Sequence, residues 1–195
     1  MHGIFQFYGY RQLFSRVLNN DDLVAKLKSH RAGSDLDFTK LDANQLRQWV
    51  RDGSVRINKV FIESLKNCLL ICDEVHNIYY QQDVNAYGLA VEVINDYYNE
   101  PKLYNPEWSS NNENCLRWLF LSATPLASSP TEIIPIVNLM NRQSDRLPYS
   151  DVFNPSTKEL TPDGLSLIGR RMDSHVSYIM DDNPIQYPSS SFVGE

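Results

Sequence analysis

The stretch Cys68-Leu-Leu-Ile-Cys-Asp-Glu-Val-His76 decides the fold of this chain. Its apolar residues run together and end on two adjacent carboxylates, Asp73 and Glu74. A short continuous apolar run is typical of a strand that is buried on both faces of a parallel sheet. Open α/β sheets bind their ligands at the carboxyl ends of such strands. The stretch therefore predicts a parallel α/β fold with a site at the end of this strand.

A second apolar stretch covers residues 116–121 and ends on Ser122-Ala-Thr124. Parallel strands of one sheet end at the same edge, so we expect the two polar ends to lie close together. His76 would then be placed to hydrogen-bond to Ser122 or Thr124, and so report the state of a bound ligand to the second strand.

The acidic pair suits a magnesium ion and a phosphate chain. Mg²⁺ keeps several waters and takes one or two carboxylates, so we expect Asp73 to hold it through its water shell. Glu74 would orient and deprotonate the attacking water, a general-base role that depends on reach to that water.

The same residues allow two other interpretations. An Asp-Glu pair after a strand could cap the next helix, because carboxylates suit helix N-termini. A zinc-protease site needs two histidines one helical turn apart around a glutamate. The four histidines are too scattered to form that pair: His2, His30, His76 and His175.

The motifs resemble those of a known family. Asp73-Glu-Val-His76 resembles motif II, and Ser122-Ala123-Thr124 resembles motif III, of superfamily 2 helicases and translocases. Residues 73–90 also resemble the helicase-like ATPases of large cytoplasmic DNA viruses. That group includes the small subunit of the poxvirus early transcription factor and nucleoside triphosphatase I. Residues 7–13 and 164–188 fit the same resemblance.

The resemblance implies a fold and a division of the chain. We expect an α/β fold, a partial RecA-like parallel sheet with flanking helices, followed by an irregular C-terminal extension. Residues 1–141 would form part of the first RecA-like, ATP-binding domain. Residues 142–195 would lead toward a second RecA-like domain.

The resemblance also implies roles for particular residues. ATP would be the substrate and Mg²⁺ the cofactor, with Asp73 as the metal residue. Catalytic residues would be Glu74 and His76, and the coupling residues would be Ser122, Ala123 and Thr124. His2 and Arg11 would contact nucleic acid, either DNA or RNA.

A phosphate-binding loop is missing from this sequence. No Gly-x-x-x-x-Gly-Lys-Ser/Thr run occurs, although such a loop supplies the backbone cradle and the lysine for the β and γ phosphates. The arginine fingers implied by the resemblance are missing too. We therefore expect part of a larger motor that is inactive alone. The alternative is a non-catalytic scaffold or virion component derived from a helicase.

Charge is unevenly distributed along the chain. Residues 1–66 carry a net charge of +4 and residues 67–195 a net charge of −10. Phosphate neutralisation by basic side chains supplies most non-specific affinity for nucleic acid. The basic residues at the amino end could instead form a solvated helix face. Five of them are the candidate phosphate contacts: Arg11, Arg16, Lys26, Lys28 and Arg31.

Composition limits the compartment and the partners. No apolar stretch approaches the roughly 18 to 20 residues that cross a membrane, and the amino end lacks a signal-peptide core. Three cysteines do not make a disulfide framework, which indicates a reducing compartment. We expect a protein that is not secreted and that has no membrane partner. The resemblance implies the host cytoplasm or the virion, with another motor domain or viral transcription proteins as partners.

Apolar spacing and capping residues predict the remaining elements. Tyr8 and Tyr10, which flank Gly9, are interpreted as packing residues, and Gly88 as a close-packing site within a helix. A short strand is expected over residues 3–8. Helices are expected over residues 10–18, 41–50, 58–67, 85–98, 130–140 and 162–172, and a further helical stretch to about residue 30 is expected after turn or cap residues at 19–22.

Overall fold

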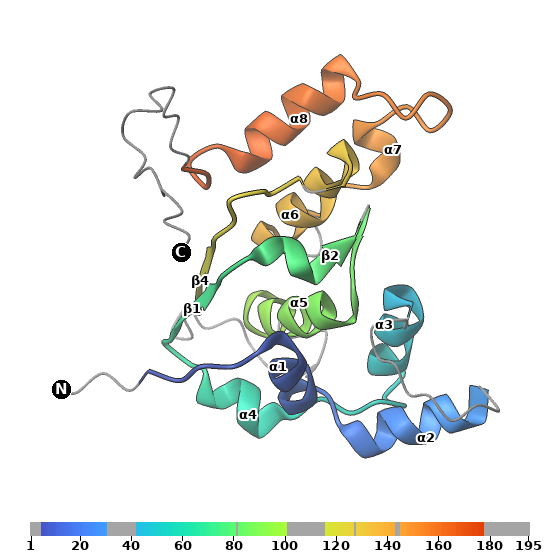
Figure 1. The fold of residues 1–195 in the computed structure, drawn as a ribbon, viewed down its shortest axis with the longest axis vertical. Coiled ribbons are helices and arrows are strands. Elements are labelled where there is room, and N and C mark those ends of the chain that lie inside the picture. Colours follow the sequence, from blue (N-terminus) through green and yellow to red (C-terminus); the bar gives the residue numbers. More distant parts are fainter. Residues whose placement is uncertain are drawn as a thin grey trace, which may run out of the picture.

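The computed structural model of this protein describes residues 5–30, 42–80, 82–100, 116–126, 128–142 and 145–177. Within these ranges helices predominate and two small sheets form. Figure 1 shows β1 and β4 at one side, α5 in the middle, α1, α2 and α4 below it, α3 to its right and α6 to α8 above it. The chain therefore has a mixed α/β fold.

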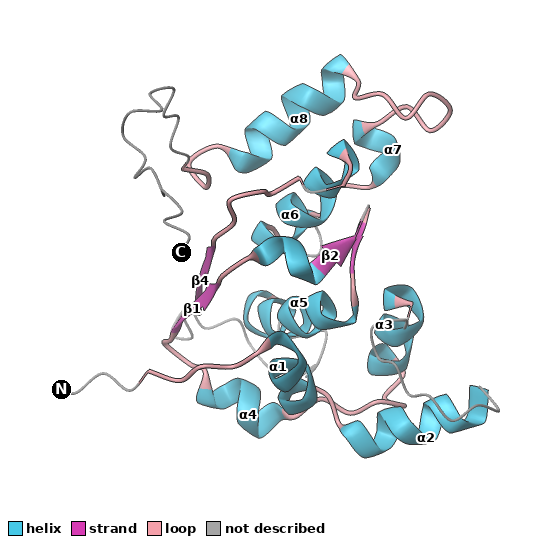
Figure 2. Ribbon diagram, viewed as in Figure 1, coloured by secondary structure: helices cyan, strands magenta, loops and turns pink. Residues whose placement is uncertain are grey.

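The larger sheet pairs β1 (Leu69–Cys72) with β4 (Arg117–Phe120) in parallel. Leu69 lies opposite Arg117, and Cys72 lies opposite Phe120. Figure 2 shows the two strands side by side, with helices on one side of them. This pairing confirms that the two apolar stretches are neighbours. A full RecA-like sheet is not present, because the described residues give this sheet two strands.

Helix α5 (Ala86–Asn99) is the centre of the main core. It begins at Asn85, whose side chain accepts hydrogen bonds from the amides of Tyr87 and Gly88. The helix is buried over most of its length. A Cβ at Gly88 would lie 2.0 Å from the Ile78 carbonyl oxygen, so this glycine is required by close packing, as predicted.

Helices α1 (Tyr10–Val17), α3 (Ala43–Arg51) and α4 (Lys59–Ser64) contact α5, and α2 (Asn20–His30) follows α1 in the chain. The α3 helix is capped by Asp42, whose side chain accepts from the Asn44 amide. The Asn58 side chain caps α4 in the same way, and the backbone amide of Asn58 donates to the Val17 carbonyl. The bond between Asn58 and Val17 joins α4 to α1, and apolar side chains pack these helices with α5 in the main core.

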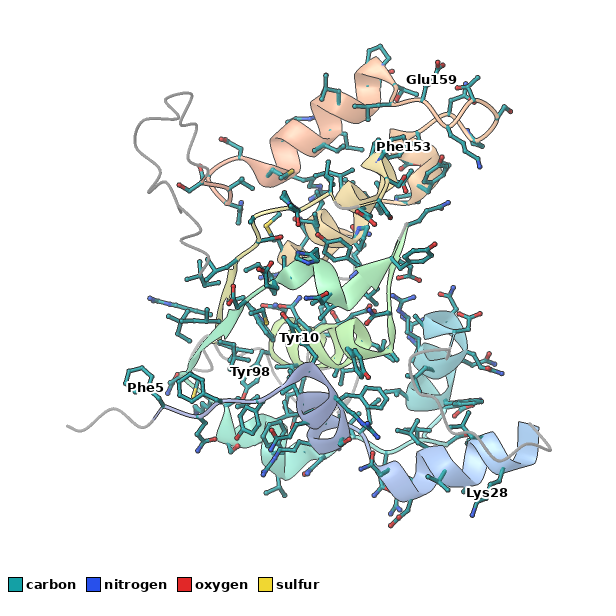
Figure 3. All side chains as sticks on the ribbon, in the orientation of Figure 1. Phe5, Tyr10, Lys28, Tyr98, Phe153 and Glu159 are labelled. Carbon is teal, nitrogen blue, oxygen red and sulfur yellow. The ribbon has the colours of Figure 1, made fainter. Side chains whose placement is uncertain are left out.

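The structure after β4 forms a second apolar cluster. A 3-10 helix, η4 (Pro130–Glu132), leads into α6 (Ile133–Met140), which is followed by α7 (Tyr149–Val152) and α8 (Pro162–Met172). Ile134, Val137, Phe153 and Ile168 pack together in this cluster. Figure 3 shows Phe153 between the helices of this part. Leu139, from the same α6 helix, packs in the main core instead.

Most predicted helices are confirmed within a few residues, including the helix over 162–172. The extension after residue 141 is more regular than expected, because α7 and α8 pack on α6. Residues 5–8 are extended but form no strand, so that part of the predicted strand is wrong. The division of the chain at residue 141 stays a prediction. Parts of the predicted loops and tail, 31–41, 101–115 and 178–195, lie outside the described residues.

A short hairpin was not predicted. It follows a 3-10 helix, η2 (Val75–Ile78), and pairs β2 (Tyr79–Tyr80) with β3 (Asp83–Val84). Within the described residues, no helix combines the length and the apolar character needed to span a bilayer.

Candidate nucleotide site at the strand ends

Hydrogen bonds bring the ends of β1 and β4 together. The Leu121 amide donates to the Cys72 carbonyl at 2.9 Å, and the Val75 amide donates to the Leu121 carbonyl at 2.9 Å. The ladder therefore continues past the strands and holds the Asp73-Glu74 turn against Ser122. This is the proximity that the sequence predicted.

Glu74 has an unusual backbone conformation, with φ 52° and ψ 51°. For a residue other than glycine this left-handed conformation costs about 1–2 kcal/mol. It ends β1 abruptly and starts the η2 helix at Val75. The helix-cap alternative is not supported for this residue, because the Glu74 side chain makes no capping hydrogen bond to η2.

His76 lies between the two candidate motifs. Its Nδ1 atom is 2.9 Å from Ser122 Oγ and 3.2 Å from Glu74 Oε2. Ser122 Oγ also accepts a hydrogen bond from the Thr124 amide at 3.2 Å. The predicted bond from His76 to the second strand end is therefore formed, and Glu74 shares the same imidazole nitrogen.

Asp73 is the residue of the turn that the sequence predicted as a metal ligand. Its side chain is exposed, and its Oδ1 accepts from the Glu74 amide at 3.0 Å. Among the described residues, no three His, Cys, Asp or Glu side chains gather into a group that could hold a metal ion. Mg²⁺ bound with a nucleotide needs one or two carboxylates beside phosphate oxygens and waters. Asp73 could therefore hold the ion only together with phosphate oxygens and waters.

Tyr10 contacts the same turn and was interpreted from the sequence only as a packing residue. Its ring packs against the main core, and its hydroxyl donates to the Asp73 carbonyl oxygen at 2.5 Å. Burial raises the pKa of Tyr10 well above its usual value, with Cys72, Asp73 and Glu74 adding to the rise. The hydroxyl therefore remains protonated and remains a donor. The sequence holds no signal for this contact, because the two residues are 63 positions apart.

Further bonds hold the second strand end. The Tyr79 hydroxyl donates to the Pro125 carbonyl oxygen. Cys72 is buried beneath the turn, and burial raises the pKa of its thiol to about 12. Cys72 is thus a packing residue, since the thiolate is the reactive form.

The predicted nucleic-acid residues are only partly described. His2 lies outside the described residues. Arg11 is exposed on α1, one residue after Tyr10. The Arg16 guanidinium lies over the rings of Tyr8 and Phe61, at 5.4 and 5.9 Å from their centroids. Ala123, the middle residue of the second motif, is exposed beside Ser122.

A network of ion pairs joins α3 and β3 to α5 and to the chain after α6. The sequence did not predict it. Arg47 from α3 binds both Asp83 and Glu92, with its Nη2 atom at 2.5 and 2.7 Å from their oxygens. Arg146 binds Glu92 at 2.6 Å and Asp96 at 2.7 Å. Buried carboxylates are usually paired in this way. We call these five residues the Arg47–Arg146 network, and its role is to join α3, α5 and the chain after α6.

The fold and the site define a class: a mixed α/β protein with a polar, acidic site at the carboxyl ends of parallel strands. Over 99% of its length the chain is 30% identical to the early transcription factor large subunit homolog of African swine fever virus isolates, covering 18% of that protein. Over 98% of its length it is 24% identical to a putative ATP-dependent RNA helicase of Acanthamoeba polyphaga mimivirus. Over 53% of its length it is 33% identical to the termination factor NPH-I homolog of African swine fever virus.

These similarities are to viral proteins whose names refer to transcription and to a helicase. They do not single out motifs II and III, and the first relatives are large-subunit homologs, where the sequence suggested a small subunit. The matched regions cover 18%, 14% and 12% of the lengths of these three relatives. No family model matches the chain. No solved structure matches it either.

Proposed function

We propose that this chain is part of a nucleic-acid-dependent ATPase motor of the superfamily 2 type that acts in viral transcription. The observation that carries the proposal is the hydrogen bond between His76 and Ser122, which joins the ends of β1 and β4. This contact places a carboxylate, an imidazole and a hydroxyl together at the strand ends, as coupling between the two motifs would require.

Each residue has a role in the proposed motor. Asp73 would hold Mg²⁺ beside the phosphates of ATP, and Glu74 would activate the attacking water. His76 shares its Nδ1 atom between Glu74 and Ser122, so a change at Glu74 would alter the bond to the second strand end. Ser122 and Thr124 would pass that change to the chain leading into α6.

The phosphate loop would come from polypeptide outside this sequence, along the open side of the sheet. β1 and β4 pair with each other, so each strand has one unpaired edge among the described residues. One face of the sheet is also open, since Leu69, Ile71 and Leu119 are 57%, 58% and 44% exposed. Parallel sheets are ordinarily covered on both faces. A further strand and helix would complete the sheet and supply the missing cradle, so we expect no ATP hydrolysis by the chain alone.

Calorimetric titration with Mg-ATP tests the proposal. We expect binding in the millimolar range that Asp73→Ala removes. Asp21→Ala is the matched control, because Asp21 is an exposed aspartate in the first turn of α2. Binding that survives Asp73→Ala, or robust hydrolysis by the purified chain, would contradict the proposal.

The second candidate is a non-catalytic scaffold or virion component. The missing phosphate loop and the open apolar sheet face favour it, because such a face suits association with another protein. The same titration separates the two candidates. No heat with Mg-ATP, in a chain that is folded, would favour the scaffold.

A further inference from the structure

We propose that Tyr10 is a positioning residue that links the nucleic-acid-contacting face of α1 to the Asp73-Glu74 turn. This inference rests on the proposed function, since it assigns a coupling role within that motor. The contact behind it joins two segments that the sequence keeps far apart.

Tyr10 reaches the Asp73-Glu74 turn from the start of α1. Tyr10 is the first residue of α1, directly after its N-cap Gly9. Its hydroxyl donates to the Asp73 carbonyl oxygen at 2.5 Å. Figure 3 shows Tyr10 at the upper end of α1, facing the middle of the molecule. The α1 helix packs in the main core with α5 through the buried side chains of Phe14 and Val17. This packing holds the backbone that carries Tyr10 in place.

The contact holds the backbone of the Asp73-Glu74 turn. Asp73 is the first residue after β1, and Glu74 follows it in the left-handed conformation. The Val75 amide is bound to the Leu121 carbonyl at 2.9 Å. The strained Glu74 is therefore held on both sides, by Tyr10 through the preceding carbonyl and by Leu121 through the following amide. Strained backbone persists only where its surroundings determine it in this way.

The surface around the start of α1 carries exposed aromatic rings and cations. Phe5 and Phe7 are 86% and 89% exposed on the extended segment that enters the helix. Arg11 is exposed on the first turn, and Arg16 lies over the Tyr8 ring. Exposed aromatic rings beside cations are the combination that binds single-stranded nucleic acid by stacking and phosphate contact. A strand bound here would act directly on the residue that holds the Asp73 carbonyl.

Tyr8 provides a matched control. It lies two residues before Tyr10, and its ring packs edge-on against Phe61. Its hydroxyl donates to Gln6 within the same segment, so it has no bond to the turn. Removing the Tyr8 hydroxyl removes a bond of the same chemical type without touching Asp73.

Hydrogen exchange of the Val75 amide tests the positioning role without any ligand. In Tyr10→Phe we expect this amide to exchange about fivefold faster, because a hydrogen bond worth about 1 kcal/mol no longer fixes the turn. Amides of the α5 core should be unchanged, and so should Val75 in Tyr8→Phe. Equal exchange of Val75 in the wild type and Tyr10→Phe would overturn the inference.

A second measurement tests the coupling. The affinity of the chain for single-stranded oligouridylate is measured with and without Mg-AMPPNP, and the ratio of the two affinities is the coupling. We expect Tyr10→Phe to bring this ratio close to one while each separate affinity stays within about twofold of the wild type. A ratio that Tyr10→Phe leaves unchanged would overturn the coupling role alone. Failure of the wild type to bind either ligand would overturn the proposed function and this inference together.

Discussion

Glu74 combines a strained backbone with a carboxylate that reaches His76 Nδ1 at 3.2 Å. Strain of this kind at a strand end accompanies functional sites, where it fixes a side chain in one direction. The carboxylate is half exposed, at 52% of its side-chain surface, so water can reach it. Glu74 is therefore the residue at which we expect a substitution to change the proposed activity most.

We predict that Glu74→Gln abolishes ATP turnover in a complex that supplies the phosphate loop, while nucleotide stays bound. Gln has the shape of Glu but cannot accept a proton, so loss of a general base should lower kcat by about 10²–10⁴-fold. Steady-state hydrolysis and nucleotide binding on the same complex measure the two effects. Normal turnover in Glu74→Gln would show that Glu74 is not the general base.

We predict that Gly88→Ala destabilises the fold. The added Cβ would lie 2.0 Å from the Ile78 carbonyl oxygen and 2.7 Å from Val84 Cβ, so the backbone must shift at a cost of about 1–3 kcal/mol. Urea unfolding gives the free-energy change. Gly169→Ala in α8 is the control, because nothing lies within 4 Å of its Cβ and alanine favours a helix by about 1 kcal/mol. A Gly88→Ala chain as stable as the wild type would contradict the packing described here.

At the scale of elements, the Arg47–Arg146 network holds α5 to its neighbours. Arg47 and Arg146 face three carboxylates, so the network carries one excess negative charge when all five groups are ionised. Burial raises the pKa of Asp96 to about 7. Arg146 and Arg51 oppose this rise, and Glu92 and Glu100 add to it. Burial outweighs the pairing with Arg146, because the Asp96 side chain is only 4% exposed.

This pKa predicts an unusual dependence of stability on pH. The folded pKa of Asp96 lies above the value of 3.8 for an exposed aspartate, so the folded state binds the proton more tightly. Its contribution to stability is full below about pH 4 and is lost as the pH rises through 7. Between pH 6 and pH 8 we expect Asp96 to lower the free energy of unfolding by about 1 kcal/mol.

Urea unfolding at both pH values, in the wild type and Asp96→Asn, measures this contribution. The asparagine should remove the extra loss of stability at pH 8. Asp22→Asn is a useful contrast, because bonds from Arg56 lower the pKa of Asp22 to about 2, below the range tested. An Asp96→Asn chain with the same dependence between pH 6 and pH 8 as the wild type would contradict this assignment.

The elements show which features a sequence can predict. The helices α1, α5 and α8 were predictable because their apolar spacing, Asn85 and Pro162 mark them locally. The neighbouring strand ends were predictable because two apolar runs both end on polar residues. The network and the Tyr10 contact were not, since they join residues 36 to 63 positions apart without a local signal. The strand expected near Phe7 failed because its apolar side chains have no described strand to pair with.

At the scale of the whole molecule, the described parts bury one face of the sheet and leave the other open. Leu69, Ile71, Leu119 and Leu121 are exposed on alternate positions of the two strand segments. Such an apolar face indicates association with further polypeptide. It agrees with relatives that are about six times as long as this chain.

We predict that the chain alone binds the dye ANS and self-associates as its concentration rises. The double variant Ile71→Lys with Leu119→Lys should reduce both effects, because the charges disrupt the open face. Leu165→Lys is the control, since Leu165 is 59% exposed on α8, away from the sheet. Fluorescence and sedimentation velocity measure the two effects. Equal dye binding by the double variant and the wild type would mean that another surface is responsible.

The central claim is that a divalent metal and a nucleotide bind where β1 and β4 end. Paramagnetic broadening of amide NMR signals by Mn²⁺ in the presence of AMPPNP tests it most directly, because Mn²⁺ takes the same oxygen ligands as Mg²⁺ and broadens only nearby signals. We expect broadening to centre on residues 73–76 and 122–124, and to vanish in Asp73→Ala. Broadening centred on Asp83 and Asp96, or no specific broadening, would contradict the claim.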